Sequence, residues 1–395
     1  MSAPANGGLG LKAKDVDASL WDWMTRFRKG KVYQPDADGD PAADPNGCIP
    51  KLALITGAGY DLGGRSLLSL GAASGLYELG LAEAAVRRGT PPSTVHLVDT
   101  DADALATATA RAESLGLTDF RAVRAAADEF AIERRYDVGF FLSLYHHYDR
   151  LGSAFRSRGM RVLGDMGRSC TTLFFETGQT DDTVPGSELW PRMLEMGSYA
   201  SPAQWLESRV PEMTGYDSFL CLGTNPRTSR HLYVFWKARP VVLSADGQDA
   251  GFGELALERA PGGAIVASGP DGTRPLPEAA ASLAGGTWLL DCRFARGVDE
   301  AERDRDFRYV AAVLGGLPRE SFALLLNDTG ALASVPAEVN AAFRIDAQSQ
   351  DDAVLQLRTA VFSGFTLVAV PARLAKGALA EAARELGVRL AVTAG

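Results

Sequence analysis

The sequence predicts an α/β protein with a doubly wound, seven-stranded, mostly parallel sheet that ends in an antiparallel hairpin, followed by a smaller C-terminal α/β domain. Two observations predict it. Four buried-strand patterns, each followed by small or helical residues, succeed one another between Arg65 and His147. A fifth apolar run at 171–179 then precedes two runs, 217–222 and 231–236, which a turn at Asn225-Pro226 joins into a hairpin.

Length and composition exclude several classes of protein. A chain of 395 residues is long enough for two or three domains with a well-buried core. The formal charge of −9 and the pI near 5.1 argue against a nucleic-acid-binding protein, which usually carries a basic excess. The four cysteines show no CxxC spacing, so neither a disulfide framework nor a zinc site is indicated. We therefore expect a cytoplasmic protein, with neither a secretion signal nor a membrane-spanning segment.

Residues 1–50 are expected to form an N-terminal helical arm. The segment 16–27 places Leu20, Trp23, Met24 and Phe27 on one helical face. Such a helix either packs on the domain that follows or acts as a lid that keeps water from a substrate.

The run 51–60 predicts an apolar strand followed by Thr-Gly-Ala-Gly, which resembles the start of a short-chain dehydrogenase. That family needs a further glycine, a helix, and a Tyr-x-x-x-Lys motif on a later helix. The matching pair here, Tyr233 and Lys237, lies in an aromatic run that predicts a strand. The residues therefore disfavour a dehydrogenase.

A glycine turn follows the strand that begins near Arg65. Gly71 and Gly75 lack a Cβ, so the backbone can adopt unusual dihedral angles and lie against a ligand. The N–H groups at the start of the next helix, predicted from Leu76 to Arg88, would point at that ligand. The geometry suits a nucleotide-like molecule, although a plain strand-to-helix turn has the same pattern.

Polar residues follow the next three predicted strands. The strand Thr94–Val98 leads to Asp99, at the spacing where a carboxylate can accept both hydroxyls of a ribose. The strand near 120–124 leads to Asp128, and the strand 137–142 leads to the segment 143–147. Helices are expected at 101–114 and 149–161. The second helix carries four arginines that predict a solvated face or, alternatively, an anchor for an anionic group: Arg150, Arg156, Arg158 and Arg161.

The turn Leu70-Gly71-Ala72-Ala73-Ser74-Gly75 resembles that of class I S-adenosylmethionine-dependent methyltransferases, with alanine at position 73 where the family usually has a third glycine. The resemblance covers about residues 65–238. It implies S-adenosyl-L-methionine as cofactor. The residues that it implies around the cofactor are Gly71, Ala72, Ala73 and Gly75 in the turn, Asp99 and Thr100 at the ribose, Asp128 at the adenine amino group, and Ser143 in the methyl-transfer cleft.

Three residues are candidates for catalysis. His146 and His147 follow the fourth strand, and either one, with His146 preferred, is a candidate general base for a hydroxyl acceptor; the alternative is that they pack or hold the loop. Glu176 ends the fifth strand, where it is expected at the cleft edge, as a substrate ligand or as a carboxylate in water. An alternative joins it to Asp149 and Glu188 in a hard-cation site, but no metal is predicted.

The run 136–236 also resembles the methyltransferase domains that cap bacterial surface polysaccharides. The residues that carry this likeness are Ser-Leu-Tyr-His-His-Tyr-Asp, Glu-Thr-Gly-Gln and the late Arg227-x-x-Arg230. The predicted function is therefore methyl transfer to a hydroxyl of a small molecule or glycan. An RNA methyltransferase and a cofactor-binding scaffold without catalysis are the alternatives.

Beyond Pro240 the chain predicts a second domain, 239–395, after a first domain at 51–238. Strands are expected at 287–291, 321–326 and 364–370, with helices at 300–314 and 375–386, and the Ala-Gly-Pro-rich stretch 260–286 is expected to be a linker. No motif there predicts chemistry. Substrate binding, dimerisation and the remnant of another enzyme are the roles left open.

Overall fold

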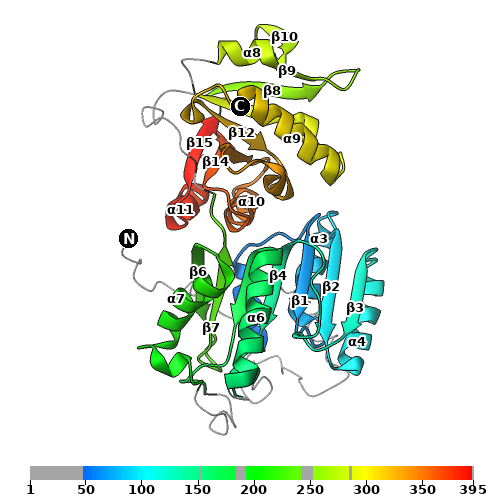
Figure 1. The fold of residues 1–395 in the computed structure, drawn as a ribbon, viewed down its shortest axis with the longest axis vertical. Helices are drawn as coiled ribbons and strands as arrows, with labels where there is room; N and C mark the ends of the chain where they lie inside the picture. The colour runs from blue at the N-terminus through cyan, green and yellow to red at the C-terminus, as the bar shows by residue number, and fades with distance from the viewer. Residues whose placement is uncertain are drawn as a thin grey trace. The chain divides into compact units, whose positions relative to one another are not determined.

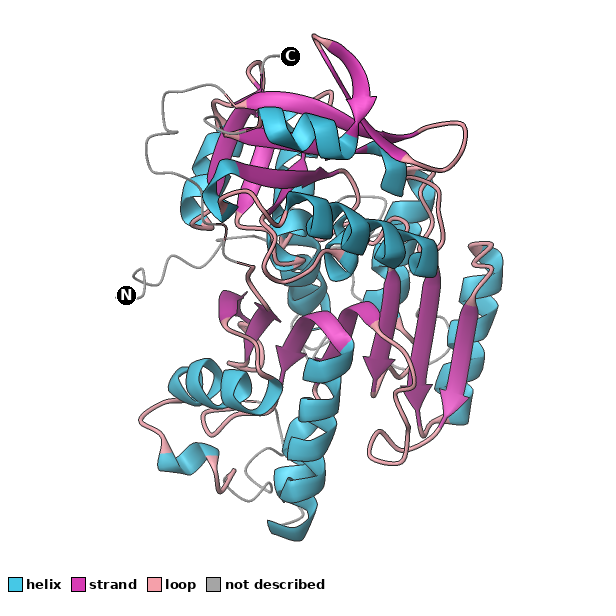
Figure 2. Cartoon of the chain, turned by 45° about the horizontal axis from the view of Figure 1, so that its top comes forward, coloured by secondary structure: helices cyan, strands magenta, loops and turns pink. Residues whose placement is uncertain are grey.

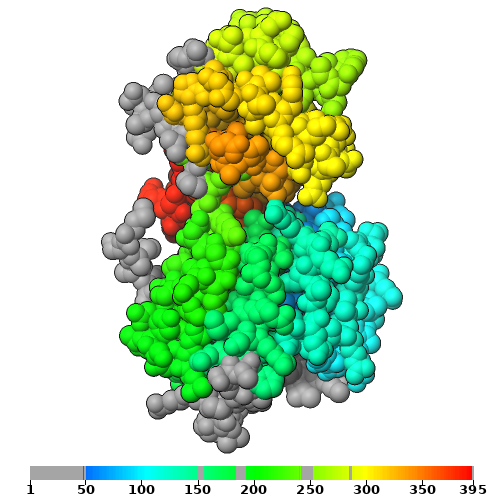
Figure 3. Space-filling model, in the orientation of Figure 1, coloured from blue at the N-terminus to red at the C-terminus, as the bar shows by residue number. Residues whose placement is uncertain are grey.

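The computed structural model describes residues 48–150, 153–183, 193–239, 241, 252–283 and 287–393. The chain divides into two compact units, Met1–Lys237 and Ala238–Gly395. The first unit is coloured blue to green and the second yellow-green to red (Figures 1 and 3). Residues 1–47 of the predicted helical arm lie outside the described residues.

The first unit contains a seven-stranded sheet with the order β3-β2-β1-β4-β5-β7-β6. Strand β7 pairs antiparallel with β5 and with β6, and the other neighbours are parallel. The predicted mostly parallel sheet with its terminal hairpin is therefore confirmed. The strands are β1 (Ser66–Leu70), β2 (Thr94–Asp99), β3 (Phe120–Arg124), β4 (Tyr136–Leu142), β5 (Cys170–Glu176), β6 (Ser218–Thr224) and β7 (His231–Trp236).

Helices flank the strands of this sheet (Figure 2), and local capping fixes where several of them begin. Asp101 accepts the N–H groups of Asp103 and Ala104 at the start of one helix, as the sequence predicts. The prediction of a single helix at 149–161 is wrong, because one helix ends at Arg150 and the next continues to Ser169. The helices are α3 (Leu76–Arg87), α4 (Ala102–Ser114), α5 (Tyr145–Arg150), α6 (Ser153–Ser169) and α7 (Pro202–Thr214).

The run predicted to be a strand at 51–60 is a helix, α2 (Cys48–Gly57). A short apolar run does not distinguish a buried strand from a buried helix, because both lack a polar face. Leu52 and Ile55 are fully buried, and the charged Lys51, which precedes them, is also buried. The helix gives this lysine a fixed place in the interior.

Both faces of the central strands are buried, as expected for a parallel sheet. On one face, Phe141 and Phe175 pack with Met166 of α6 and Trp205 of α7. On the other face, the rings of Phe140 and Phe174 stack with their centroids 4.9 Å apart. The carboxyl ends of these strands are therefore held rigidly.

The second unit is also α/β, with an eight-stranded sheet in the order β10-β9-β8-β11-β12-β13-β14-β15. Strands β8 and β11 to β15 are parallel, and β9 and β10 are antiparallel to their neighbours. The strands are β8 (Gly253–Arg259), β9 (Ile265–Gly269), β10 (Gly272–Pro275), β11 (Trp288–Cys292), β12 (Phe322–Leu326), β13 (Ala341–Arg344), β14 (Leu367–Pro371) and β15 (Arg389–Thr393). The helices are α8 (Leu276–Ser282), α9 (Glu300–Leu314), α10 (Gln350–Phe362) and α11 (Ala378–Glu385).

The prediction of a linker at 260–286 is wrong. Its described part contains β9, β10 and α8, and its glycines form turns: Gly263 and Gly272 both have positive φ. Leu276 and Ala279 of α8 are buried, so the segment contributes to the core. Small residues there mark tight turns and close packing.

Among the described helices, not one combines the length and the apolar character that crossing a bilayer would require.

Candidate functional site

The turn between β1 and α3 has a left-handed backbone at three positions. Gly71, Ala73 and Gly75 have φ of 76°, 46° and 68°. A Cβ at Gly71 would meet the side chain of Leu144 at 2.9 Å, and one at Gly75 would meet Leu97 at 2.6 Å. Both positions therefore favour glycine, for their left-handed dihedral angles and for space.

The predicted cofactor residues of the first two strands lie together at this turn. The Asp99 carboxylate accepts the Ala73 N–H through Oδ2 at 2.7 Å and the Asp101 N–H through Oδ1 at 2.9 Å. The Gly71 and Ala72 N–H groups donate to the carbonyl of the residue before Asp99, at 2.8 and 3.1 Å. Asp99 is thus fixed against the bend.

Thr100 follows Asp99 and is exposed, and its carbonyl accepts the Arg124 side chain at 3.3 Å. It therefore lies at the end of β2, beside the bend.

Helix α3 begins at the bend without a side-chain cap on its first N–H groups. Its Glu78 is buried, and Oε1 accepts the Ser69 hydroxyl at 2.5 Å, whereas Oε2 has no hydrogen-bond partner. Burial raises the pKa of Glu78 to about 7. The start of α3 therefore carries a buried carboxyl group that titrates near neutrality.

Asp128, predicted at the adenine, lies beyond β3 and contacts the helices after β4. Its carboxylate accepts the Tyr148 hydroxyl at 3.3 Å and Arg158 at 3.4 Å, and its carbonyl accepts Arg161 at 2.7 Å. Two of the predicted arginines thus bind Asp128, Arg158 at its carboxylate and Arg161 at its backbone carbonyl. These bonds restrain Asp128 from one side.

Ser143, at the end of β4, is the centre of a buried polar network. It has a left-handed backbone with φ of 56°. Its hydroxyl lies 2.7 Å from Lys51 Nζ, 2.8 Å from Glu176 Oε2 and 3.3 Å from Arg230 Nη1. The strained backbone is therefore held by three side chains from α2, β5 and the β6–β7 turn.

Glu176 is engaged through both carboxylate oxygens. Oε2 pairs with Lys51, and Oε1 lies 3.3 Å from Arg230, whose Nε lies 2.6 Å from Asp182. Burial opposes ionisation of Glu176, but the two cations and their hydrogen bonds outweigh it and hold its pKa below the usual value. The two carboxylates, Glu176 and Asp182, thus balance the charges of two cations, Lys51 and Arg230, in the interior.

The structure corrects the expected place of Glu176. Its exposed fraction is 0%, so it does not lie in water at the cleft edge. Lys51 and Arg230 pair with the two carboxylate oxygens of Glu176. Glu176 is therefore not available as a ligand for the alternative hard-cation site with Asp149. The described residues contain no group of three side chains suited to a metal ion, and Glu188 lies outside them.

The two histidines after β4 differ in their surroundings. His146 is buried, and its ring Nδ1 accepts the Gly178 N–H at 3.0 Å. The backbone N–H of His146 donates to the Thr177 hydroxyl at 2.9 Å. A neutral His146 therefore carries its proton on Nε2. His147 is half-buried, with its ring centroid 4.1 Å from that of His146.

Gln179, three residues beyond β5, is a buried amide without a partner. Its side-chain oxygen and nitrogen are both inaccessible and neither has a hydrogen bond. Its backbone carbonyl accepts the Asp182 N–H at 3.1 Å. An unsatisfied buried amide is costly, and such groups are concentrated at functional sites.

From the sequence, no role was assigned to Lys51, Asp182 or Glu78, and Gln179 and Arg230 were noted only as part of a resemblance. One signal was available, since a lysine inside an otherwise apolar run is unusual. The other contacts join positions more than 30 residues apart or depend on rotamers, and no spacing in the sequence predicts them.

No protein-family model and no curated protein matches this chain. Among solved structures, the chain is similar to the bifunctional kinase-methyltransferase WbdD, with 18% identity, a TM-score of 0.38 and coverage of 57% of this chain and 47% of that chain. The chain thus spans about half the length of that protein.

It is also similar to the N-methyltransferase NodS from Bradyrhizobium japonicum in complex with S-adenosyl-L-homocysteine (10% identity, TM-score 0.35, 55% and 98% coverage). A further similar structure is an O-methyltransferase from Nostoc punctiforme described as putative (16% identity, TM-score 0.35, 56% and 69% coverage). The strand order with antiparallel β7, observed directly, is the order expected from the resemblance to class I methyltransferases.

Proposed function

We propose that this chain is an S-adenosyl-L-methionine-dependent methyltransferase that acts on a hydroxyl group of a small molecule or glycan. The observation that carries the proposal is the bond between Asp99 and the Ala73 N–H, which fixes an acid from β2 over a left-handed bend after β1. This bend lies next to the point where the strand order reverses, between β1 and β4, and ligands of open parallel sheets bind at such points.

The residues at the bend fit the cofactor. The N-terminus of α3 has the positive end of its helix dipole at the bend, and Asp99, with two further lone pairs, can accept ribose hydroxyls. Gly75 is needed for the bend itself, since a Cβ there would collide with Leu97. When bound, the cofactor supplies an electrophilic methyl group on a sulfonium.

The chain must orient a hydroxyl for in-line attack and accept its proton. His146 already accepts the Gly178 N–H on Nδ1, and in the neutral ring its Nε2 holds the proton. It therefore has no lone pair ready for a substrate. We assign the general base to His147 and a positioning role to His146, while Ser143 and Glu176 hold the end of β4 in place.

Binding of S-adenosyl-L-homocysteine tests the cofactor site. Titration calorimetry should show binding to the natural chain and loss of at least tenfold affinity in Asp99→Ala, because both ribose hydrogen bonds and the fixed bend are lost. Asp103→Ala, an exposed acid in the first turn of α4, is the matched control and should bind normally. Equal affinity in Asp99→Ala and the control would refute the site.

Labelled-methyl transfer to sugar and small-molecule fractions tests the reaction. His147→Ala should lower turnover about 100-fold or more without changing cofactor affinity, because the general base is lost. His146→Ala should lower turnover less. Cofactor binding without transfer to any fraction would instead indicate the scaffold alternative.

A further inference from the structure

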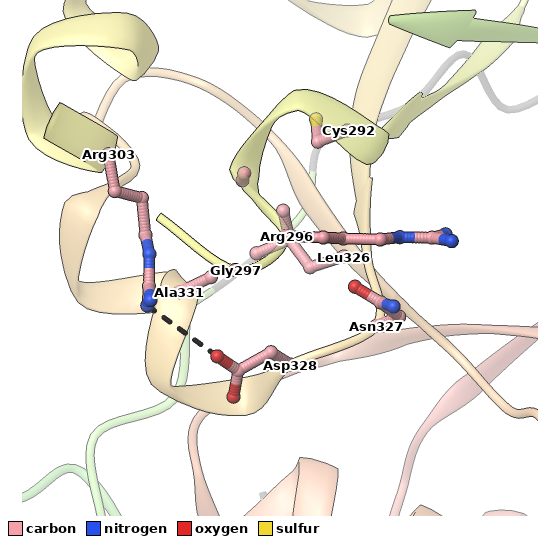
Figure 4. A pocket seen from close by; sticks show the side chains of 9 residues that line it. Cys292, Arg296, Gly297, Arg303, Leu326, Asn327, Asp328 and Ala331 are labelled. Carbon is pink, nitrogen blue, oxygen red and sulfur yellow. Dashed lines mark ion pairs between the residues drawn. The ribbon is translucent and has the colours of Figure 1, made fainter. Parts of the chain in front are cut away.

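The cavity of the second unit has its charged side chains paired within the chain. It has a volume of about 260 Å³ and lies at the carboxyl ends of β11 and β12. Arg303 pairs with Asp328 at 3.5 Å, and the Arg296 side chain extends away from both (Figure 4) and pairs with Asp291 at 3.1 Å. The described residues therefore leave no charged group of this cavity unpaired.

Glu78, in the first unit, is a buried carboxyl group that is only half satisfied. It lies in the first turn of α3 and is 2% exposed. Its Oε1 accepts the Ser69 hydroxyl at 2.5 Å, whereas its Oε2 is buried and has no hydrogen-bond partner among the described residues. A buried charged oxygen without a donor is costly, so a positive charge that comes near would stabilise the ionised form.

The bond between Ser69 and Glu78 closes the bend at which the cofactor is expected. Ser69 belongs to β1 and Glu78 to α3, so the bond joins the two elements that the bend connects. Asp99 holds the same bend through the Ala73 N–H at 2.7 Å. Two carboxyl groups are therefore fixed to this short segment.

No cation of the buried network is left to balance Glu78. Lys51 of α2 is the charged side chain that acts on Glu78, and it lowers the pKa of that carboxyl. However, Lys51 pairs with Glu176, and Arg230 is shared between Glu176 and Asp182. These four charges add up to zero, so an ionised Glu78 adds one excess negative charge to the interior.

The other charged groups beside α3 do not balance Glu78 either. Towards α4, Arg87 and Arg111 both pair with Glu83. The backbone N–H groups of Tyr77 and Glu78 also lower the pKa of the Glu78 carboxyl, but burial outweighs these effects and raises it to about 7. Glu78 is therefore neutral in mild acid and ionised in mild base.

We propose that the ionised Glu78 carboxylate is the counter-charge for the sulfonium of S-adenosyl-L-methionine, and that it makes the site prefer this cofactor over the product. The proposal rests on the proposed function, since it concerns the same bend. A cation at the positive end of the α3 dipole is unfavourable unless a negative charge offsets it.

The preference follows from the charge change in the reaction. Methyl transfer leaves the neutral thioether of S-adenosyl-L-homocysteine, while the proton of the acceptor hydroxyl passes to the general base. The product thus loses the attraction of Glu78, whereas its adenosine and amino-acid groups are unchanged. A negative charge here therefore favours binding of the donor and release of the product.

Titration calorimetry on the full chain, without an acceptor, measures the affinities for S-adenosyl-L-methionine and S-adenosyl-L-homocysteine at about pH 6 and about pH 8. The measured quantity is the ratio of the dissociation constant of the product to that of the cofactor. From the lower to the higher pH, this ratio should rise about tenfold more in the natural chain than in Glu78→Gln. Titration of the ligands themselves acts on both chains alike and does not contribute to the difference.

Two further variants separate the charge from the structure. Glu78→Gln keeps an oxygen for the Ser69 hydroxyl, so it removes the charge without removing the bond. Ser69→Ala removes the bond and keeps the charge, so it should weaken both ligands alike and move the rise to higher pH, because the Ser69 hydroxyl lowers the pKa of Glu78. Glu113→Gln, at an exposed acid of α4, should match the natural chain.

Thermal unfolding of every variant confirms that it is folded. An equal rise in the natural chain and in Glu78→Gln, with both ligands bound, would overturn the role of Glu78 and leave the cofactor site in place. Binding of neither ligand to the natural chain would overturn both.

Discussion

The Lys51 ammonium and the Glu176 carboxylate form an ion pair inside the first unit, with side-chain exposures of 5% and 1%. Helix α2 supplies the lysine and β5 the acid, 125 positions apart in the chain. The pair determines the first two predictions about the polar network, since any change of one partner leaves a buried charge.

Lys51→Met should destabilise the protein by about 3–5 kcal/mol in urea unfolding, because Glu176 then keeps only Arg230, which Asp182 already neutralises. Lys237→Met, at an exposed lysine of the same unit, should change stability by less than about 0.5 kcal/mol.

The double variant Lys51→Met/Glu176→Gln removes the uncompensated charge and should recover part of that loss. A double variant no more stable than Lys51→Met would show that the two charges do not interact.

Glu78 should make stability depend on pH. Burial raises its pKa to about 7 in the folded chain from the ordinary value of 4.5, so the folded state binds more protons than the unfolded state between these values. Stability is therefore lost as pH rises from about 4.5 to about 7.

Glu78→Gln should gain about 3 kcal/mol relative to the natural chain across that range and stay constant above it. Unfolding free energies from pH 4.5 to 8 measure the difference. The exposed Glu113→Gln should show no such trend, and a flat difference for Glu78→Gln would mean that its carboxyl titrates normally.

Gly75→Ala and Gly116→Ala form a matched pair, because both glycines have φ of 68°. An alanine at Gly116 meets nothing within 4 Å, so it should cost only the left-handed backbone term of about 1–2 kcal/mol. At Gly75 its Cβ would also lie 2.6 Å from Leu97, so we expect a loss larger by about 1–3 kcal/mol.

Calorimetry should further show that only Gly75→Ala loses S-adenosyl-L-homocysteine binding. Equal stability losses in the two variants would show that Leu97 moves away freely.

Gln179→Leu should stabilise the chain by about 1 kcal/mol, because it removes two buried polar atoms that have no partners. Gln356→Leu is the contrasting control: that amide makes three hydrogen bonds, two with the backbone of Asp346 and one with Asp352, so the same change should destabilise. Urea unfolding compares them. A loss in Gln179→Leu as large as that in Gln356→Leu would mean that the buried amide is satisfied in solution.

The bend and its acid followed from local patterns. Gly71, Gly75 and Asp99 were predicted together because a glycine turn and a strand-end carboxylate have fixed spacings in a βαβ unit, and the structure joins them through the Ala73 N–H. Whether they hold a cofactor remains a prediction. The expected helix at 149–161 and the linker at 260–286 failed because turn residues between short elements do not show how far each element extends.

By itself, the sequence determined the alternation of strands and helices and the hairpin that ends the seven-stranded sheet. Hydrophobic periodicity and turn residues suffice for this, because both depend only on residues that are close together in the chain. Only the tertiary structure decided that Lys51 lies on a helix, that Glu176 is buried between two cations, and that His146 has its Nδ1 lone pair in use. The physical reason is that charge pairing and protonation depend on distances between side chains remote in sequence, which chain folding alone sets.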